Sequence, residues 1–168
     1  MRMLKCGMTL VAAAVALPSF GQNEPQRQRT NRVAGMWRPL SLKSTLNGVT
    51  SQPFGPHPDG LLEFNENLHY VECIVNPDVP AFAASDPQNA TATEIRTAFL
   101  GSLSLFGTYT INSKGEFTDN YVDGATIPNW KGNIRDNAHL TEVVNGDTMS
   151  EVFHNGDLTV EITWQRVK

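Results

Sequence analysis

The chain has 168 residues and a formal net charge of −4 at neutral pH. This length predicts one domain. An acidic chain without a basic cluster does not fit a protein that binds nucleic acid or an anionic membrane surface, so we expect neither partner.

The first residues have the pattern of a secretory signal peptide. Arg2 and Lys5 precede an apolar run at 8–17, and small residues lead up to Gly21. The run is too short to span a bilayer. We therefore expect residues 1–21 to be removed, the mature protein to be secreted or periplasmic, and no stable membrane insertion after cleavage.

Residues 22–33 contain almost no apolar side chains and predict a disordered linker before a folded domain at 34–168. Cys6 lies in the predicted signal peptide. Cys73 would then be alone and could not form an intramolecular disulfide. We expect Cys73 to be a buried small hydrophobe, with a hydrophobic core holding the fold together.

Two β segments separated by proline-rich loops follow. Residues 35–44 predict a first strand, in which Pro39 requires a sheet edge or a bulge because proline has no N–H for a ladder. Residues 61–75 predict a hairpin. The high proline content of 48–60 and 76–90 predicts loops.

A single short helix is predicted next. Thr91 and Glu94 form a Ser/Thr-x-x-Glu capping box, the signature of a helix N-terminus. Apolar residues then recur at helical spacing: Ile95, Ala98, Phe99 and Leu103.

The rest of the chain predicts short antiparallel strands. Asn145-Gly146 and Asn155-Gly156 are typical of type I′ hairpin turns, and residues 158–167 alternate as a half-buried strand. About eight strands in sequential hairpins predict an all-β fold, an eight-stranded antiparallel up-and-down barrel with one short helix. The interior of such a barrel is filled by side chains or holds one small ligand.

Residues on the first and last predicted strands are expected to contact each other. Gly35 and Trp37 open the first strand, and Arg166 lies on the apolar face of the last strand. A guanidinium stacked on the Trp37 ring would compensate for the burial of that charge. A Gly-x-Trp start with a basic residue on the last strand looks like the closure of lipocalins and their calycin relatives.

Four segments in the middle of the chain occur in this order, "PFGPHPDGLLEF" (53–64), "NPDVPAFAASD" (76–86), "FGTYTIN" (106–112) and "IPNWKGN" (127–133). Together they resemble the bacterial and fungal lipocalin-like domain family, and the resemblance covers residues 35–167. Two sites depart from the family pattern: Asp119-Asn120 stand where relatives often carry histidines, and Asn76 stands where an arginine is common. The resemblance implies a barrel that holds a small molecule, and calycin-type barrels also include cyclases and isomerases.

The motifs of catalysis are missing from the sequence. The four histidines have no metal-ligand spacing, so we predict no metal site. There is no nucleophile elbow and no glycine-rich nucleotide loop, so we assign no catalytic residue and no cofactor.

The candidate ligand-binding residues are those expected at the barrel interior or its mouth. Trp130 either plugs a corner after Pro128 or forms the lip of a binding site. The faces of two strands stay open, since either Glu72 or His69 points inward, and Asp123 points inward only if Tyr121 does. The candidates are Tyr70, Glu72, Tyr109, Tyr121, Asn129 and Trp130.

These residues predict that a small, mostly apolar molecule binds in the barrel cavity. One alternative is a cyclase or isomerase that uses one acid–base residue in the same cavity. Another is a structural or partner-binding barrel with a filled interior.

Overall fold

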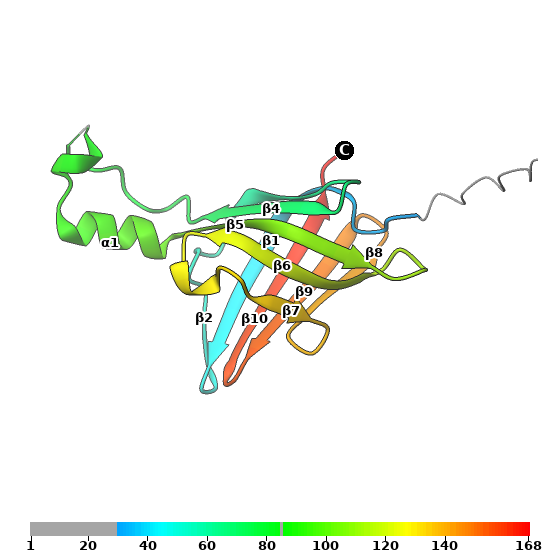
Figure 1. Cartoon of the computed structure of the whole chain (residues 1–168). Coiled ribbons are helices and arrows are strands. Elements are labelled where there is room, and N and C mark those ends of the chain that lie inside the picture. The colour runs from blue at the N-terminus through cyan, green and yellow to red at the C-terminus, as the bar shows by residue number, and fades with distance from the viewer. Residues whose placement is uncertain (1–29, 85) are drawn as a thin grey trace, which may run out of the picture.

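The computed structural model describes residues 30–84 and 86–168. Within these ranges one antiparallel ten-stranded sheet curls into a nearly closed barrel, with one α-helix and two short 3-10 helices (Figure 1). The strands are β1 (Gly35–Leu46), β2 (Val49–Ser51), β3 (Asp59–Phe64), β4 (His69–Val75), β5 (Ser102–Ile111), β6 (Phe117–Ala125), β7 (Ile134–Asp136), β8 (Leu140–Asn145), β9 (Thr148–Asn155) and β10 (Leu158–Arg166).

The predicted all-β barrel is confirmed. The strands are paired in the order β7-β6-β5-β4-β3-β1-β10-β9-β8, with β2 added beside β1. The described strands number ten and not eight, because the three-residue strands β2 and β7 are too short to show alternation in the sequence. β7 and β8 form the two edges of the sheet, and β8 approaches β6 and β7 across this seam.

The core is formed by alternate residues of the long strands, whose side chains point into the barrel. Along β4, for example, every second side chain is buried, which is the period of a half-buried strand. The largest fully buried side chains are Trp37, Trp164, Tyr109, Leu42, Leu62, Ile74, Leu105 and Met149.

The predicted contact between the first and last strands is confirmed. The guanidinium of Arg166 lies 3.9 Å from the centroid of the Trp37 ring. Arg166 Nη2 also donates to the carbonyl of Arg32 at 2.9 Å, and Trp37 Nε1 donates to the carbonyl of Val33 at 2.9 Å. The barrel is therefore closed at this point by residues from both ends of the described chain.

The structure describes only the last residues of the predicted linker 22–33. Val33 is buried, and Asn31 Nδ2 donates to Tyr109 Oη at 2.6 Å. These residues pack against the barrel. The rest of the linker and the predicted signal peptide 1–21 lie outside the described residues.

Three hairpin turns lie where Asn-Gly pairs occur in the sequence, but only one has the type I′ pattern. Asn47 and Gly48 both have positive φ, 50° and 78°, between the paired residues that end β1 and begin β2. At the two turns that we predicted to be type I′, Asn145 pairs with Thr148 and Asn155 pairs with Leu158, so each asparagine is the last residue of its strand. Gly146 and Gly156 then take the first central position with φ near 60°, as in type II′ turns.

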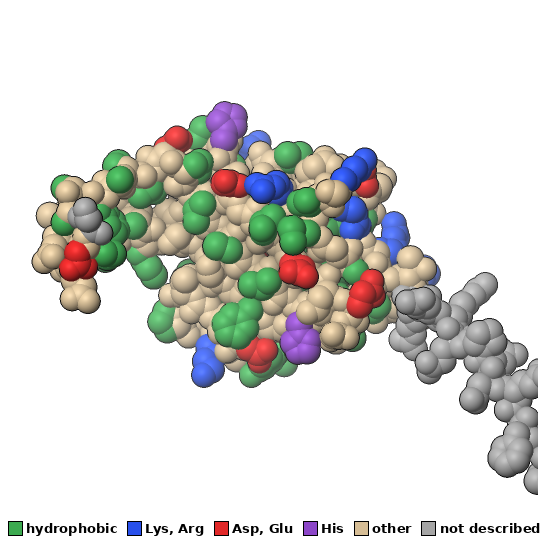
Figure 2. Space-filling view, turned by 90° about the horizontal axis from the view of Figure 1, so that it is seen from above, with side chains coloured by type: hydrophobic (Ala, Val, Ile, Leu, Met, Phe, Trp, Pro, Cys, Tyr) green, Lys and Arg blue, Asp and Glu red, His purple; other side chains and the backbone are tan. Residues whose placement is uncertain are grey.

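The predicted helix is α1 (Ala92–Leu100), and its capping box is confirmed. Thr91 Oγ1 accepts from the N–H of Glu94 at 3.3 Å, and a Glu94 carboxylate oxygen accepts from the N–H of Thr91 at 2.7 Å. The helix projects away from the barrel wall (Figures 1 and 2). Its side chains Ile95, Phe99 and Leu100 are exposed.

Candidate functional site

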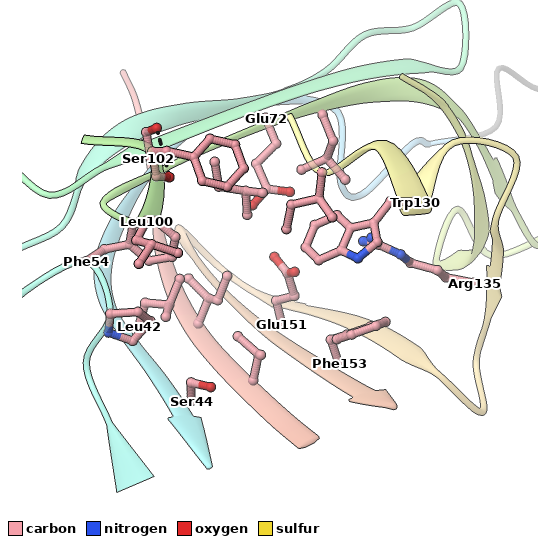
Figure 3. Close-up of a pocket in the computed structure, with 17 residues that line it drawn as sticks. Leu42, Ser44, Phe54, Glu72, Leu100, Ser102, Trp130, Arg135, Glu151 and Phe153 are labelled. Carbon is pink, nitrogen blue, oxygen red and sulfur yellow. Dashed lines mark hydrogen bonds between the residues drawn. The ribbon is translucent and has the colours of Figure 1, made fainter. Parts of the chain in front are cut away.

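The barrel holds a cavity of about 270 Å³, which we call the main cavity. Its mouth lies beside exposed residues of the loop at Pro53 and of the end of α1, and its walls are mostly apolar. Figure 3 shows it. The lining side chains are Leu42, Ser44, Pro53, Phe54, Glu72, Phe99, Leu100, Ser102, Leu103, Leu105, Ile127, Trp130, Arg135, Glu151, Phe153, Val160 and Ile162.

Two carboxyl groups line the main cavity from different strands. Glu72 is buried because it shares a face of β4 with Tyr70 and Ile74. Glu151 is buried because it shares a face of β9 with Met149. Figure 3 shows both side chains directed into the cavity.

A third buried carboxyl group, that of Glu142, lies next to Glu151. The two residues are direct partners in the antiparallel pair of β8 and β9. Like charges directly opposite each other in a sheet are unfavourable. Glu72, Glu142 and Glu151 are called the inner carboxyls below.

The surroundings of the inner carboxyls favour their neutral forms. Burial raises the pKa of Glu72 well above its ordinary value, with a further rise from the charge of Glu151. Burial, and then the charges of Glu151 and Glu72, also raise the pKa of Glu142. Burial raises the pKa of Glu151 to about 7, although the Trp164 hydrogen bond and the Arg135 charge oppose the rise.

Arg135 of β7 is the one cationic side chain among the residues that line the main cavity. Its guanidinium lies 4.7 Å from the ring centroid of Trp130 and 4.8 Å from that of Phe153. Both distances are within the range of favourable cation–π contacts. The stacking fixes the guanidinium where it lines the cavity (Figure 3).

Trp130 has both roles that the sequence left open, as a plug of the corner after Pro128 and as part of the binding site. Pro128 begins a 3-10 turn, Pro128–Trp130, in which the N–H of Trp130 donates to the carbonyl of Ile127 at 3.0 Å. The partly buried ring packs against the core and also lines the main cavity. The corner therefore both closes the barrel wall and contributes to the site.

The predicted residues Tyr70 and Tyr109 are buried but do not line the main cavity. Tyr109 Oη donates to the carbonyl of Asn65 at 2.7 Å, and its ring contacts Phe64 edge-on at 4.8 Å between centroids. Tyr70 packs in the same core cluster, and its hydroxyl finds no hydrogen-bond partner among the described residues. Burial raises the pKa of Tyr70 above its ordinary value.

Tyr121 lies on the outside, which corrects the expectation that it faces the barrel interior, and neither Tyr121 nor Asn129 lines the main cavity. A bulge causes the change at Tyr121, because Thr110 pairs with Asp119 whereas the next residue, Ile111, pairs with Phe117. The extra residue reverses the alternation, so that Phe117 is buried and Tyr121 is 42% exposed. Asn129 is exposed on the 3-10 turn.

The same alternation decides the open choice on β4. Glu72 points inward, so His69 and Cys73 point outward. Cys73 is exposed, which corrects the expectation that it is buried. Asp123 also lies on the outer face, beside Val122, which is buried.

Sequence reasoning missed Arg135, Glu142 and Asn120, all of which are buried. Arg135 belongs to a strand of three residues, too short for a periodic signal. Asn120 follows the β6 bulge, which the sequence did not reveal. Among the described residues, no group of three or more His, Cys, Asp or Glu side chains is arranged to hold a metal ion.

Among the described residues, no helix has both the length and the apolar character to cross a membrane.

The chain was compared with protein families, curated proteins and solved structures. No curated protein and no solved structure matches the chain significantly. Residues 34–167, nearly the full barrel, match the family described as "Lipocalin-like domain". The chain therefore belongs to the lipocalin-like domain family, and its barrel architecture fits the binding of a small molecule in a cavity.

Proposed function

We propose that the protein is exported and binds one small, mostly apolar molecule in the main cavity. The observation that carries the proposal is a cavity of about 270 Å³ with mostly apolar walls and three charged or acidic side chains in its lining, Glu72, Glu151 and Arg135. Ligand sites are typically concave and apolar with a few convergent polar groups. The signal-like sequence at residues 1–21 supports export.

The binding energy would come mainly from burial of apolar surface. Each Å² of apolar surface removed from water contributes roughly 25 cal/mol. Phe99 and Leu100 are exposed beside the mouth and would lose contact with water when a ligand covers them. The polar groups of Glu72, Glu151 and Arg135 in the lining would orient the ligand.

The first experiment is native mass spectrometry of the protein purified from the envelope and culture medium of its own host. A bound small molecule of reproducible mass is the expected result. Ser44→Trp should abolish binding, because Ser44 lines the cavity. Lys43→Trp is the matched control, since Lys43 is exposed on the other face of β1. Equal ligand occupancy in both variants would contradict the assignment of the cavity.

A second candidate function is acid–base catalysis on a small apolar substrate. The observation that favours it is Glu151, which lines the cavity and has a pKa of about 7. A group that titrates near neutral pH is suited to transfer protons.

Incubation of host metabolites with a small amount of protein distinguishes the two functions. A binding protein removes at most an equimolar amount of one compound. An enzyme converts a large excess, and Glu151→Gln should abolish that conversion.

A further inference from the structure

The guanidinium of Arg135 has no polar partner within the described part of the chain. Arg135 is only 7% exposed, and its Nη2 is buried without a hydrogen-bond acceptor. A buried charged donor without a partner is strongly unfavourable, and native proteins rarely tolerate it. A ligand with an acceptor oxygen, bound in the cavity that Arg135 lines, would satisfy this donor.

The contacts of Arg135 within the described residues are with ring faces and give its N–H groups no acceptor. The rings of Trp130 and Phe153 lie near the guanidinium, at 4.7 and 4.8 Å from their centroids. Such contacts stabilise the charge through the ring faces but do not satisfy the N–H groups. A planar guanidinium that is held in place presents its donors as a fixed fork, which matches the two oxygens of a carboxylate.

The carboxyl groups nearby do not take this role. Glu72 and Glu151 line the same cavity, yet among the described residues neither forms an ion pair with Arg135 within 4.0 Å. Glu151 instead accepts from Trp164 Nε1 at 2.8 Å. Burial raises the pKa of both glutamates and favours their neutral forms, so that Arg135 supplies the positive charge of the cavity.

We infer that Arg135 binds the carboxylate of the ligand, and that the ligand is a small carboxylic acid with an apolar body. This inference rests on the proposed function and adds a ligand class to it. The apolar body would occupy the part of the cavity lined by Leu42, Leu105 and Ile162. Neutral Glu72 and Glu151 would then be hydrogen-bond donors next to the carboxylate and not competing anions.

The test is isothermal titration of the mature protein with octanoate, octan-1-ol and octylamine, at a pH below the Glu151 pKa of about 7. The three probes have the same apolar chain and differ in the polar group. We expect the Kd of octanoate to be at least about tenfold lower than that of octanol, because hydrogen bonds between charged groups are stronger than those between neutral groups. Octylamine should bind most weakly, since its charge repels Arg135.

Variants at Arg135 separate its role from a general effect on the fold. Arg135→Gln should abolish the preference for octanoate and leave octanol binding within about twofold. Arg135→Lys, which keeps the charge but not the fork, should retain part of the preference. Arg38→Gln is the control, because Arg38 is an exposed arginine paired with Asp59 on the outer surface at 3.1 Å.

The possible outcomes distinguish this inference from the proposed function. Equal affinity for octanoate and octanol, or tightest binding of octylamine, would overturn the role of Arg135 while leaving a binding barrel. Failure of all three probes to bind would overturn the proposed function and the inference together. If Arg135→Gln does not fold, the comparison of probes on the unmodified protein and on Arg135→Lys still decides the matter.

Discussion

Replacement of Glu151 by glutamine should reduce the pH dependence of stability. A buried carboxyl group with a raised pKa carries stability that is fully present below its unfolded value and is lost as the pH rises through its folded value. For Glu151 these values are 4.5 and about 7. At about 1.4 kcal/mol for each tenfold change in proton affinity, the loss is about 3 kcal/mol.

Glutamine is uncharged at every pH and can still accept the hydrogen bond from Trp164 Nε1. Glu151→Gln should therefore equal the wild type near pH 4.5 and exceed it by up to about 3 kcal/mol above pH 7. Removal of the Glu151 charge should also lower the pKa of Glu72 and of Glu142, which that charge raises. This coupling makes the remaining dependence weaker still.

The assay is urea denaturation of both proteins at a series of pH values, with the free energy of unfolding extrapolated to water. Glu161→Gln is the matched control, because Glu161 is exposed on the adjacent strand β10. Parallel stability curves for the wild type and Glu151→Gln would refute the conclusion that Glu151 is buried in its neutral form.

Three further substitutions test the fold. Arg166→Met should lower the free energy of unfolding by about 1–3 kcal/mol, because the charge-assisted hydrogen bonds and the Trp37 stacking are lost; urea titration measures this, and an unchanged midpoint would contradict it. Gly107→Ala should destabilise by more than about 2 kcal/mol, since the new Cβ would lie 1.9 Å from the carbonyl oxygen of Tyr121; a thermal midpoint equal to that of the wild type would contradict this and show that the backbone at the register shift between Phe106 and Gly107 can relax. Thr91→Ala should speed amide exchange in α1 through loss of about 1 kcal/mol of capping energy, and unchanged exchange rates would mean that the cap does not limit opening of the helix.

Much of the fold follows from local patterns. The two-residue period predicted the long strands, the capping box predicted the start of α1, and proline predicted the irregularity in β1 between Pro39 and Ser41. The contact of Arg166 with Trp37 was also predictable, because a charge on an apolar face requires a partner. The first three features arise from residues close together in the sequence, and the fourth from the expected pairing of the first and last strands.

The candidate site was less predictable, because alternation separates two faces without saying which is inside. Glu72 and His69 fitted the pattern equally well until the neighbouring strands placed Glu72 in the core. One extra residue in β6 moved Tyr121 from the expected inner face to the outer one. The sequence therefore identified Glu72 and Trp130 as candidates, but their place at the cavity depended on the closed sheet.

The sequence by itself determined that this chain forms an antiparallel barrel with one capped helix, since these features arise from periodicity, turn residues and capping within short segments. Only the tertiary structure placed Arg135 between Trp130 and Phe153 and brought Glu72 and Glu151 into the same cavity. The reason is physical: side chains from separate strands meet only when the sheet curls, and their charge states depend on the burial that follows.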